Sequence, residues 1–194
     1  MTKPERREQL LDVTRDIVWE DGFHEVSIEA VARRAGITRP VVYEHFGDLG
    51  GLLEEMLGRE TARALAQLGA VLPSADTAGD TGDALLAALR GYLDAVAADP
   101  VTWRLVLMPP EGAPEILREQ IGLGRDAVVA ILAEVMRPGL APGLVSPDPA
   151  LTARLLSALA DEAARLMLTR PEDFPRERLM DHAEWLLGCL TRPG

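Results

Sequence analysis

Apolar residues recur at spacings of three and four along almost the whole chain, while β-branched or aromatic residues alternating with polar ones are nearly absent. The first pattern is typical of amphipathic helices, and the second is the pattern of half-buried strands. Proline and glycine interrupt the helical pattern at residues 73–82, 108–114, 138–149 and 170–175. The sequence therefore predicts an all-α fold of about nine helices.

The first fifty residues have the punctuation of three helices. The first is expected over about residues 5–21 and ends at Gly22, because glycine tolerates the left-handed conformation that closes a helix. Ser27 is a suitable N-cap for a short second helix, which ends at Ala35-Gly36. After this glycine, Thr38 is the expected cap of a short third helix. Two short helices around a tight glycine turn predict a helix-turn-helix, whose second helix enters the major groove of DNA.

Spacing separates the two faces of the third helix. Val42 and Phe46 lie four residues apart and are expected in the core. The outward side carries Arg39 and Val41, which we interpret as base readers because arginine binds guanine edges and an apolar side chain fits a thymine methyl group. Phosphate contacts are expected from polar groups at the flanks and at the second helix's N-terminus. The outward positions considered for these roles are Ser27, Thr38, Pro40, Tyr43 and His45.

The stretch GFHEVSIEAVARRAGITRPVVYEHFGDLGGLLEEML resembles the signature of the tetracycline-repressor (TetR) family, over about residues 8–57. The resemblance implies a dimeric one-component transcriptional regulator, commonly a repressor, that binds a palindromic double-stranded operator and is released by a small molecule. By position it implies phosphate contacts from Ser27, Thr38, Tyr43 and His45, and base contacts around Arg39, Pro40 and Val41. It also implies a DNA contact from Arg33 or Arg34.

One position departs from the family pattern, because Leu49 follows Asp48 where the family usually has a lysine. This substitution removes an expected phosphate contact. The basic residues Lys3, Arg6 and Arg7 fit either an arm for the minor groove or a solvated helix start.

The charge balance limits how the head could bind DNA. The chain carries a formal net charge of −11, and residues 1–50 hold seven basic and ten acidic groups. Because DNA binding depends on local positive potential, we expect weak nonspecific affinity and an operator interaction that weakens steeply with salt. The main alternative within the same fold is a partner-binding protein whose acidic head binds protein and not DNA.

Other function classes find little support in the residues. The three histidines are scattered, and neither a nucleophile elbow, a phosphate loop nor an HExxH motif occurs, so we expect no enzyme and no cofactor. Cys189 is the only cysteine, which excludes an intrachain disulfide, and we expect it to be a buried small hydrophobe. Zinc-ligand spacing is absent, and no apolar run has the length of a membrane span, so the expected location is the cytoplasm with neither metal nor membrane.

Residues 48–194 are expected to form the effector-binding and dimerisation domain, after a DNA-binding domain over 1–47. Its first helix begins at the cap Asp48, and Gly50-Gly51 in the first turns predicts a soft joint because glycine weakens helices. The candidate lining of an apolar effector pocket is Tyr92, Trp103, Leu107, Met108, Met136 and Glu162. Asp161 and Glu162 are either solvated or the polar end of that pocket, and the sequence favours solvation.

The last two helices are the candidate dimer surface, because their apolar stripes predict a four-helix bundle between two copies. The expected interface residues are Leu155, Leu159 and Leu166 on the first of them, and Leu179, Ala183, Leu186, Leu187 and Leu190 on the second, with Trp185 as an anchor.

Overall fold

The computed structural model describes residues 1–73, 81–109, 115–139 and 144–191, with the side chains of 115–117 and 190–191 left aside. In these ranges the chain forms nine α-helices and one 3-10 turn, with no β-sheet, which confirms the all-α prediction. The elements are α1 (Lys3–Glu20), η1 (Phe23–Glu25), α2 (Ile28–Ala35), α3 (Arg39–Phe46), α4 (Leu49–Gly69), α5 (Thr81–Ala98), α6 (Pro100–Leu107), α7 (Glu115–Val135), α8 (Pro149–Thr169) and α9 (Arg176–Thr191).

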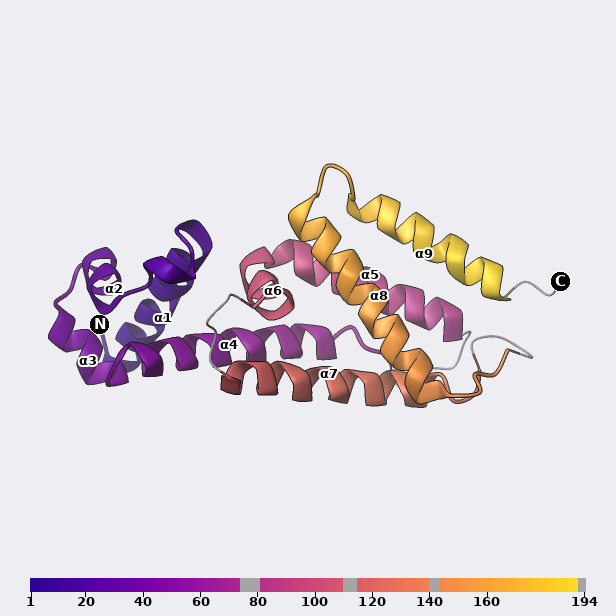
Figure 1. Cartoon of the computed structure of the whole chain (residues 1–194), viewed down its shortest axis with the longest axis horizontal. Helices are drawn as coiled ribbons and strands as arrows, with labels where there is room; N and C mark the ends of the chain where they lie inside the picture. The colour runs from indigo at the N-terminus through magenta and orange to yellow at the C-terminus, as the bar shows by residue number, and fades with distance from the viewer. Residues whose placement is uncertain (74–80, 110–114, 140–143, 192–194) are drawn as a thin grey trace.

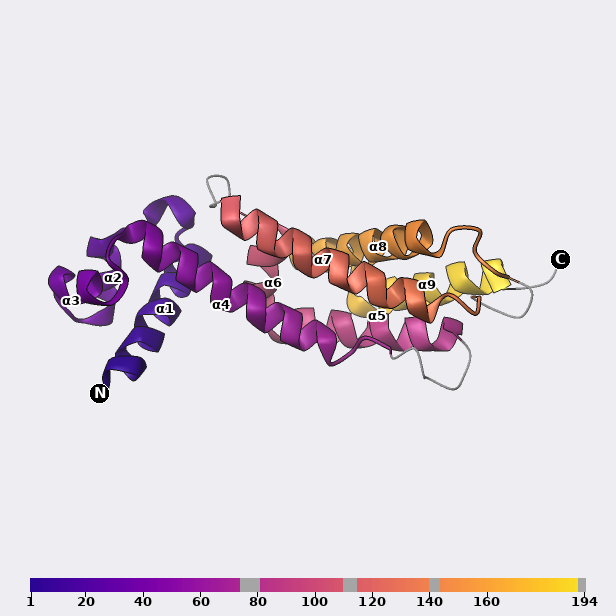
Figure 2. The same cartoon turned by 90° about the horizontal axis from the view of Figure 1, so that it is seen from below.

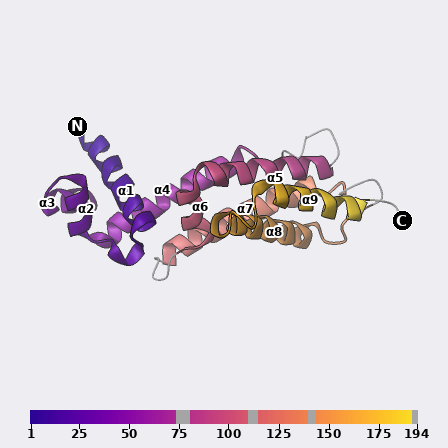
Figure 3. The same ribbon diagram turned by 90° about the horizontal axis from the view of Figure 1, so that it is seen from above.

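The molecule is elongated, with α1, α2 and α3 forming a head at one end and the C-terminus at the other (Figure 1). α4 leaves the head and runs into the body, where it lies beside α7 (Figure 2). α6 packs on α4 close to the head, and α9 lies along α5 on the outside of the body (Figure 3). α4 and α6 are therefore the helices through which the head and the body meet.

The head is held together by one apolar core to which each of its α-helices contributes. Leu10 and Ile17 of α1, Val31 of α2 and Val42 of α3 are buried there, as the three-and-four spacing predicts. The first half of α4 joins the same core through Leu52, Leu53, Met56 and Leu57. Because α4 takes part in the cores of both head and body, the division of the chain at residue 47 stays a prediction.

Two helix starts differ from expectation. α1 begins at Lys3, two residues earlier than predicted, because Thr2 and Glu5 form a capping box: the Thr2 hydroxyl accepts from the Glu5 N–H at 3.4 Å, and the Glu5 carboxylate accepts from the Thr2 N–H at 2.7 Å. Thr38 occupies the N-cap position of α3 but its side chain makes no capping hydrogen bond. The hydroxyl of Thr38 is therefore not committed to its own helix.

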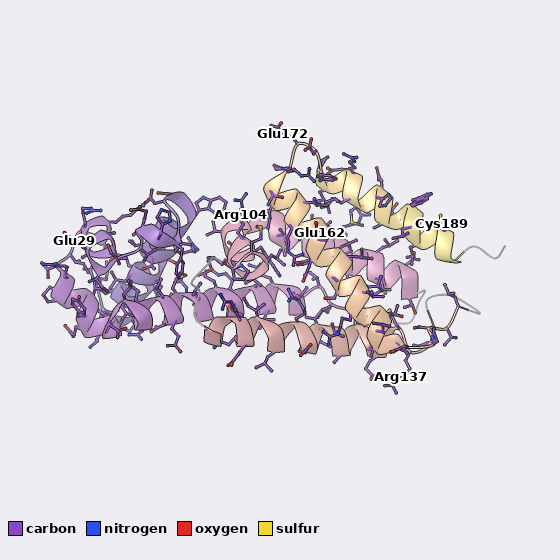
Figure 4. All side chains as sticks on the ribbon, in the orientation of Figure 1. Glu29, Arg104, Arg137, Glu162, Glu172 and Cys189 are labelled. Atoms are coloured by element: carbon purple, nitrogen blue, oxygen red, sulfur yellow. The ribbon has the colours of Figure 1, made fainter. Side chains whose placement is uncertain are left out.

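The body contains two further apolar clusters. The larger one joins α4, α5, α6, α8 and α9 around Tyr92, Trp103 and Met167. The smaller one joins α7 to α8 around Met136, which is fully buried. Cys189, which we expected in the interior, is exposed near the end of α9 (Figure 4). That prediction was wrong, because α9 turns another of its faces towards α5.

Candidate nucleic-acid interface and effector cavity

The turn between α2 and α3 has the geometry that the sequence predicts. The Ser27 hydroxyl accepts from the Ala30 N–H at 3.1 Å and caps α2. Gly36 ends α2 in the left-handed conformation (φ 68°, ψ 34°), and the N–H of Ile37 bonds the carbonyl of Ala32 at 3.0 Å. This closed turn fixes the direction in which α3 leaves α2. The arrangement is a helix-turn-helix.

α3 presents a short, open outer face. Val42 is fully buried against α2 and α4, whereas Arg39, Pro40 and Tyr43 are exposed and Val41 is half-buried. Tyr43 is 49% exposed although it is a large aromatic residue. The outer face therefore combines a cation, an apolar edge and a phenol on one rigid helix, which is the set of groups that base edges and phosphates engage.

Two carboxylates of α2 and α3 pair with cations of the head near this face. Glu29 of α2 lies 4.0 Å from the guanidinium of Arg39, and Glu44 of α3 pairs with Lys3 at 3.2 Å. Arg34, a predicted DNA contact, instead donates to Glu20 and to Asp21 at the end of α1. The hydrogen bond to Glu20 and the neighbouring carboxylates raise the pKa of Arg34. A phosphate would have to draw Arg34 away from these partners.

Arg7 has a structural role that the sequence analysis did not assign. Its guanidinium pairs with Glu55 of α4, donates to the carbonyl of His45 at 2.5 Å and lies 4.7 Å above the ring of Phe46. Arg7 thus joins α1, α3 and α4, and it is not a free arm for the minor groove. The signal was present in the sequence, because Arg7 continues the apolar stripe that contains Leu10.

His45 is half-buried at the end of α3. Its Nδ1 atom is covered and has no hydrogen-bond partner among the described residues. The phosphate contact expected from His45 stays a prediction, as do the contacts expected from Ser27, Thr38 and Tyr43.

Asp48 caps α4 as predicted, with Oδ1 accepting from the Gly51 N–H at 2.8 Å. Leu49 is half-buried and packs against the head core, so the position where the family usually has lysine contributes apolar contact here. Gly51 has a steric reason for lacking a side chain. A Cβ atom at Gly51 would overlap the carbonyl oxygen of Phe46.

A small cavity of about 50 Å³ lies in the body. It is lined by Thr61, Ala64, Leu65 and Leu68 of α4, Tyr92 of α5, Trp103, Val106 and Leu107 of α6, Ile121, Gly124, Arg125 and Val128 of α7, and Ser157 and Asp161 of α8. Three predicted pocket residues, Tyr92, Trp103 and Leu107, are therefore on its wall. The rings of Tyr92 and Trp103 meet edge to face, with centroids 5.0 Å apart.

The other three predicted pocket residues lie away from this cavity. Met108 packs on the larger apolar cluster of the body, and Met136 is buried in the smaller one between α7 and α8. Glu162 is exposed on the outer side of α8 and pairs with Arg165 at 3.2 Å (Figure 4). Periodicity identifies apolar positions but does not say which cluster each one joins.

Asp161 forms the polar wall of the cavity, which is the alternative to the solvated position that we expected. Its carboxylate accepts from the Tyr92 hydroxyl at 3.2 Å and pairs with Arg125 at 2.9 Å, and its side chain is only 16% exposed. Burial and the negative charge of Asp161 raise the pKa of Tyr92. The sequence shows a tyrosine and an aspartate on helical stripes, but it does not predict that they meet, because they lie on two helices far apart in the chain.

Only some residues of the predicted dimer surface are exposed, and others are half-buried or pack within the chain. Leu155 and Leu159 are more than half exposed, and Leu166 is half-buried on the same stripe of α8. On α9, Leu179 packs on the body and Ala183 and Leu187 are half-buried, while Leu186 and Trp185 are exposed. The side chain of Leu190 lies outside the described residues. Leu155 and Leu159 of α8, and Trp185 and Leu186 of α9, are thus left uncovered in the single chain.

The described residues contain no cluster of three or more metal-ligating side chains. Within the same residues, no helix combines the length and the apolar character needed to cross a membrane.

The fold and the head together define a class of protein, an all-helical chain with an N-terminal helix-turn-helix. Residues 10–56 match the family described as bacterial regulatory proteins, tetR family. The match covers the helix-turn-helix and the start of α4, so the head of this chain resembles the DNA-binding part of that family.

Comparisons with individual proteins agree with this resemblance. A stretch of 52 residues is 44% identical to the HTH-type transcriptional regulator BetI of Klebsiella pneumoniae (strain 342), covering 27% of each chain. A longer stretch of 106 residues is 28% identical to the HTH-type transcriptional activator FasR of Mycolicibacterium smegmatis (strain ATCC 700084 / mc(2)155), covering 55% of this chain and 47% of that protein. The chain thus matches about a quarter to a half of the length of these relatives.

The likeness in fold extends further than the likeness in sequence. A TetR-like transcriptional regulator from Rhodococcus sp. RHA1 superposes with a TM-score of 0.72 and 23% identity, covering 97% of this chain and 96% of that one. The body therefore shares its helical architecture with this regulator, while its side chains are largely different.

Proposed function

We propose that this protein is a DNA-binding transcriptional regulator that reads a two-fold symmetric operator as a homodimer and is released from it by a small hydrophobic effector. The observation that carries the proposal is the outer face of α3, where Arg39, Pro40 and Tyr43 are exposed on a helix fixed by the closed turn at Gly36. Release by an effector makes repression the expected mode. The relative named as an activator, FasR, is similar to this chain over 106 residues, so the sign of regulation is part of the proposal.

The proposed DNA contacts follow the chemistry of each exposed group. Arg39 donates to the O6 and N7 atoms of guanine, and Val41 with Pro40 contacts thymine methyl groups. Tyr43 donates its hydroxyl to a phosphate on one side of the groove, and Thr38, whose hydroxyl makes no capping bond, donates to another. Glu29 releases Arg39 on binding, because the 4.0 Å contact between two exposed groups is weak.

The effector is proposed to occupy the cavity beside Tyr92 and Trp103. Its present volume of about 50 Å³ is far below the roughly 300–1,000 Å³ of ligand pockets, so an effector must push the walls apart. Two of these walls are α4 and α6, which also contact the head.

Dimerisation is proposed through the uncovered apolar surface of Leu155, Leu159, Trp185 and Leu186. All four are large apolar side chains that a single chain leaves exposed to water, and groups of such side chains mark interaction surfaces in soluble proteins. Two-fold pairing is what a palindromic operator requires, with recognition helices about 34–36 Å apart.

The experiment that tests the DNA-binding function is enrichment of a random duplex library by the purified protein, followed by fluorescence anisotropy titration. We expect a palindromic site with half-site centres about 10 base pairs apart. Arg39→Ala should cost about 1–3 kcal/mol and relax the preference at one base pair, whereas Tyr43→Phe should weaken all duplexes evenly. Arg137→Ala is the charge-matched control, because Arg137 lies at the end of the body away from the head (Figure 4).

Loss of affinity on Arg39→Ala equal to that on Arg137→Ala would contradict this function. Failure to enrich any duplex, combined with capture of a protein partner by the head, would favour the acidic partner-binding alternative.

A further inference from the structure

Arg59 on α4 links the head to the body by charged contacts. Its guanidinium donates to Glu8 and to Asp12 of α1, both at 2.9 Å. The same guanidinium donates to the neighbouring Glu60 at 2.8 Å and 3.0 Å. Arg59 itself is only 19% exposed, whereas Glu8 and Asp12 are 63% and 52% exposed, so Arg59 is held in place on α4 while water and salt still reach its partners on α1. α1 is therefore tied to α4 at the point where the head ends.

Glu60 carries the connection onward to α6. Its carboxylate is 1% exposed, and Oε2 accepts the hydroxyl hydrogen of the fully buried Thr102. Arg63 adds a weaker contact at 3.6 Å. A buried carboxylate is costly unless its oxygens keep their donors, so α4 and α6 cannot separate at this point without leaving Glu60 under-satisfied.

This linked pair adjoins the cavity on both helices. Thr61, which follows Glu60, lines the cavity, and so does Trp103, which follows Thr102. The indole N–H of Trp103 also donates to Gln67 of α4 at 2.8 Å. Any ligand that displaces the Trp103 ring must therefore move the segment of α6 that carries Thr102.

We propose that Thr102 is a positioning residue for operator binding, because its hydrogen bond to the buried Glu60 transmits expansion of the cavity to α4, and Arg59 carries that movement to α1 and the head. The proposal rests on the proposed DNA-binding function and names the residues that regulate it. When the cavity expands, Thr102 moves with α6 and draws Glu60 and α4 with it. α1 follows because Glu8 and Asp12 hold Arg59. The recognition helix then leaves the separation that the operator requires.

The test uses a cavity-filling substitution in place of the unidentified effector. Ser157 is buried on the cavity wall and belongs to α8, so it is part of neither α4 nor α6, and Ser157→Phe introduces a ring that the cavity cannot hold without moving its walls. Operator affinity is measured by anisotropy on the enriched duplex, with and without Ser157→Phe, in four backgrounds: the unchanged chain, Thr102→Val, Thr102→Ser and Thr14→Val. Thr14→Val is the matched control, because Thr14 is equally buried but its hydroxyl bonds only its own helix, at Leu10.

In the unchanged chain, Thr102→Ser and Thr14→Val backgrounds, Ser157→Phe should weaken operator binding about tenfold or more, within the range of ordinary allosteric coupling. In the Thr102→Val background the loss should fall to about twofold or less, because the hydroxyl that transmits the movement is absent. Thr102→Ser rescues because it retains that hydroxyl. Circular dichroism establishes that each variant is folded, and Ser157→Leu replaces Ser157→Phe where the phenylalanine variant is not.

An equal loss in all four backgrounds would overturn the proposal, because the movement would then reach the head by another route. No loss in the unchanged chain would overturn it too, because the cavity would then be uncoupled from DNA. Failure of the unchanged chain to enrich any duplex is a different result, which refutes the regulator function itself and this inference with it.

Discussion

Gly51 shows how a single residue can have a different role from the one its intrinsic propensity indicates. Sequence analysis treats Gly50 and Gly51 alike, as weak helix formers that soften the start of α4. In the structure, the backbone of Gly51 packs against the carbonyl oxygen of Phe46, so that α4 begins directly against the end of α3. Gly50 has no such backbone neighbour and meets only the Asp48 side chain at 3.2 Å. The close approach, rather than softness, accounts for Gly51.

We therefore predict opposite behaviour for the two alanine substitutions. Gly51→Ala should destabilise the protein by about 1–3 kcal/mol, because the added methyl group must push α3 away from α4. Gly50→Ala should change the free energy of unfolding by less than about 1 kcal/mol, since the gain in helix propensity offsets a small shift of Asp48. Thermal unfolding followed by circular dichroism measures both, and equal melting temperatures for the two variants would contradict the steric account.

Tyr92 gives a prediction about pH. Burial and the carboxylate of Asp161 raise the pKa of the Tyr92 phenol in the folded protein, whereas an unfolded tyrosine ionises near about 10. Above that pH the unfolded state releases this proton and the folded state keeps it. Stability from Tyr92 is thus fully present below about pH 10 and falls by about 1.4 kcal/mol per pH unit above it.

The chain has two tyrosines, Tyr43 and Tyr92. The measurement uses Tyr43→Phe, so that Tyr92 is the one tyrosine that absorbs. Absorbance at about 295 nm should show no phenolate near pH 10 while the protein is folded, and ionisation only together with unfolding. Unfolding free energies of Tyr92→Phe should depend less on alkaline pH than those of the parent chain. Phenolate formation in the folded protein near pH 10 would show that the Tyr92 pKa is not raised.

At the residue scale, local chemistry was predictable and partners distant in the chain were not. The caps at Ser27 and Asp48 follow from residue type and position, because the bonds they make lie within one helical turn. The contacts of Arg7 with Glu55, and of Asp161 with Tyr92, join residues far apart in the chain. No spacing rule within one helix identifies such pairs.

At the scale of helices, the apolar stripes predicted which elements form but not what covers each one. α8 and α9 both carry stripes that we assigned to a dimer interface. Leu179 of α9 is instead used by the chain's own body, and Leu155 and Leu159 of α8 remain open. A stripe records only that a face avoids water, so intramolecular and intermolecular partners give the same pattern.

The open stripe of α8 predicts the oligomeric state. Leu155→Glu combined with Leu159→Glu should yield a monomer of about 21.0 kDa, whereas we expect the unchanged protein to be a dimer of twice that mass. The physical reason is that each substitution removes apolar burial worth about 1.5–3 kcal/mol and places a charge at the contact. Light scattering at micromolar concentration provides the measurement.

The matched control for this test is Leu123→Glu on α7. Leu123 is 71% exposed but lies outside the proposed interface, so this variant should remain dimeric. A dimer that survives both α8 substitutions, or one that is lost equally on Leu123→Glu, would place the interface elsewhere.

At the scale of the whole molecule, the net charge of −11 opposes DNA binding, and the structure shows where that opposition is concentrated. Several cations of the head are neutralised by acids: Arg34 by Glu20 and Asp21, and Arg59 by Glu8 and Asp12. Within the described part of the head, specific contacts on α3 must therefore supply affinity that bulk positive charge does not. Because the repulsion acts on every sequence, it lowers the affinity for operator and random duplexes alike, and discrimination between sites depends on the contacts of α3.

Glu29 pairs with Arg39 of the proposed reading face and Glu44 of α3 pairs with Lys3, so the removal of these two carboxylates tests this balance. Glu29→Gln together with Glu44→Gln should strengthen binding to operator and random duplexes alike, by about 0.2–1 kcal/mol for each carboxylate in each head. The gain arises because Arg39 and Lys3 lose their competing partners, and because two carboxylates no longer repel the DNA phosphates. It should shrink as salt rises, since screening shortens the reach of exposed charges. Anisotropy titrations across a salt series provide the measurement, with Glu172→Gln, at the turn between α8 and α9, as the control that removes one carboxylate outside the head (Figure 4). An increase for Glu172→Gln half as large as for the pair would mean that total charge, and not its position beside α3, governs the affinity.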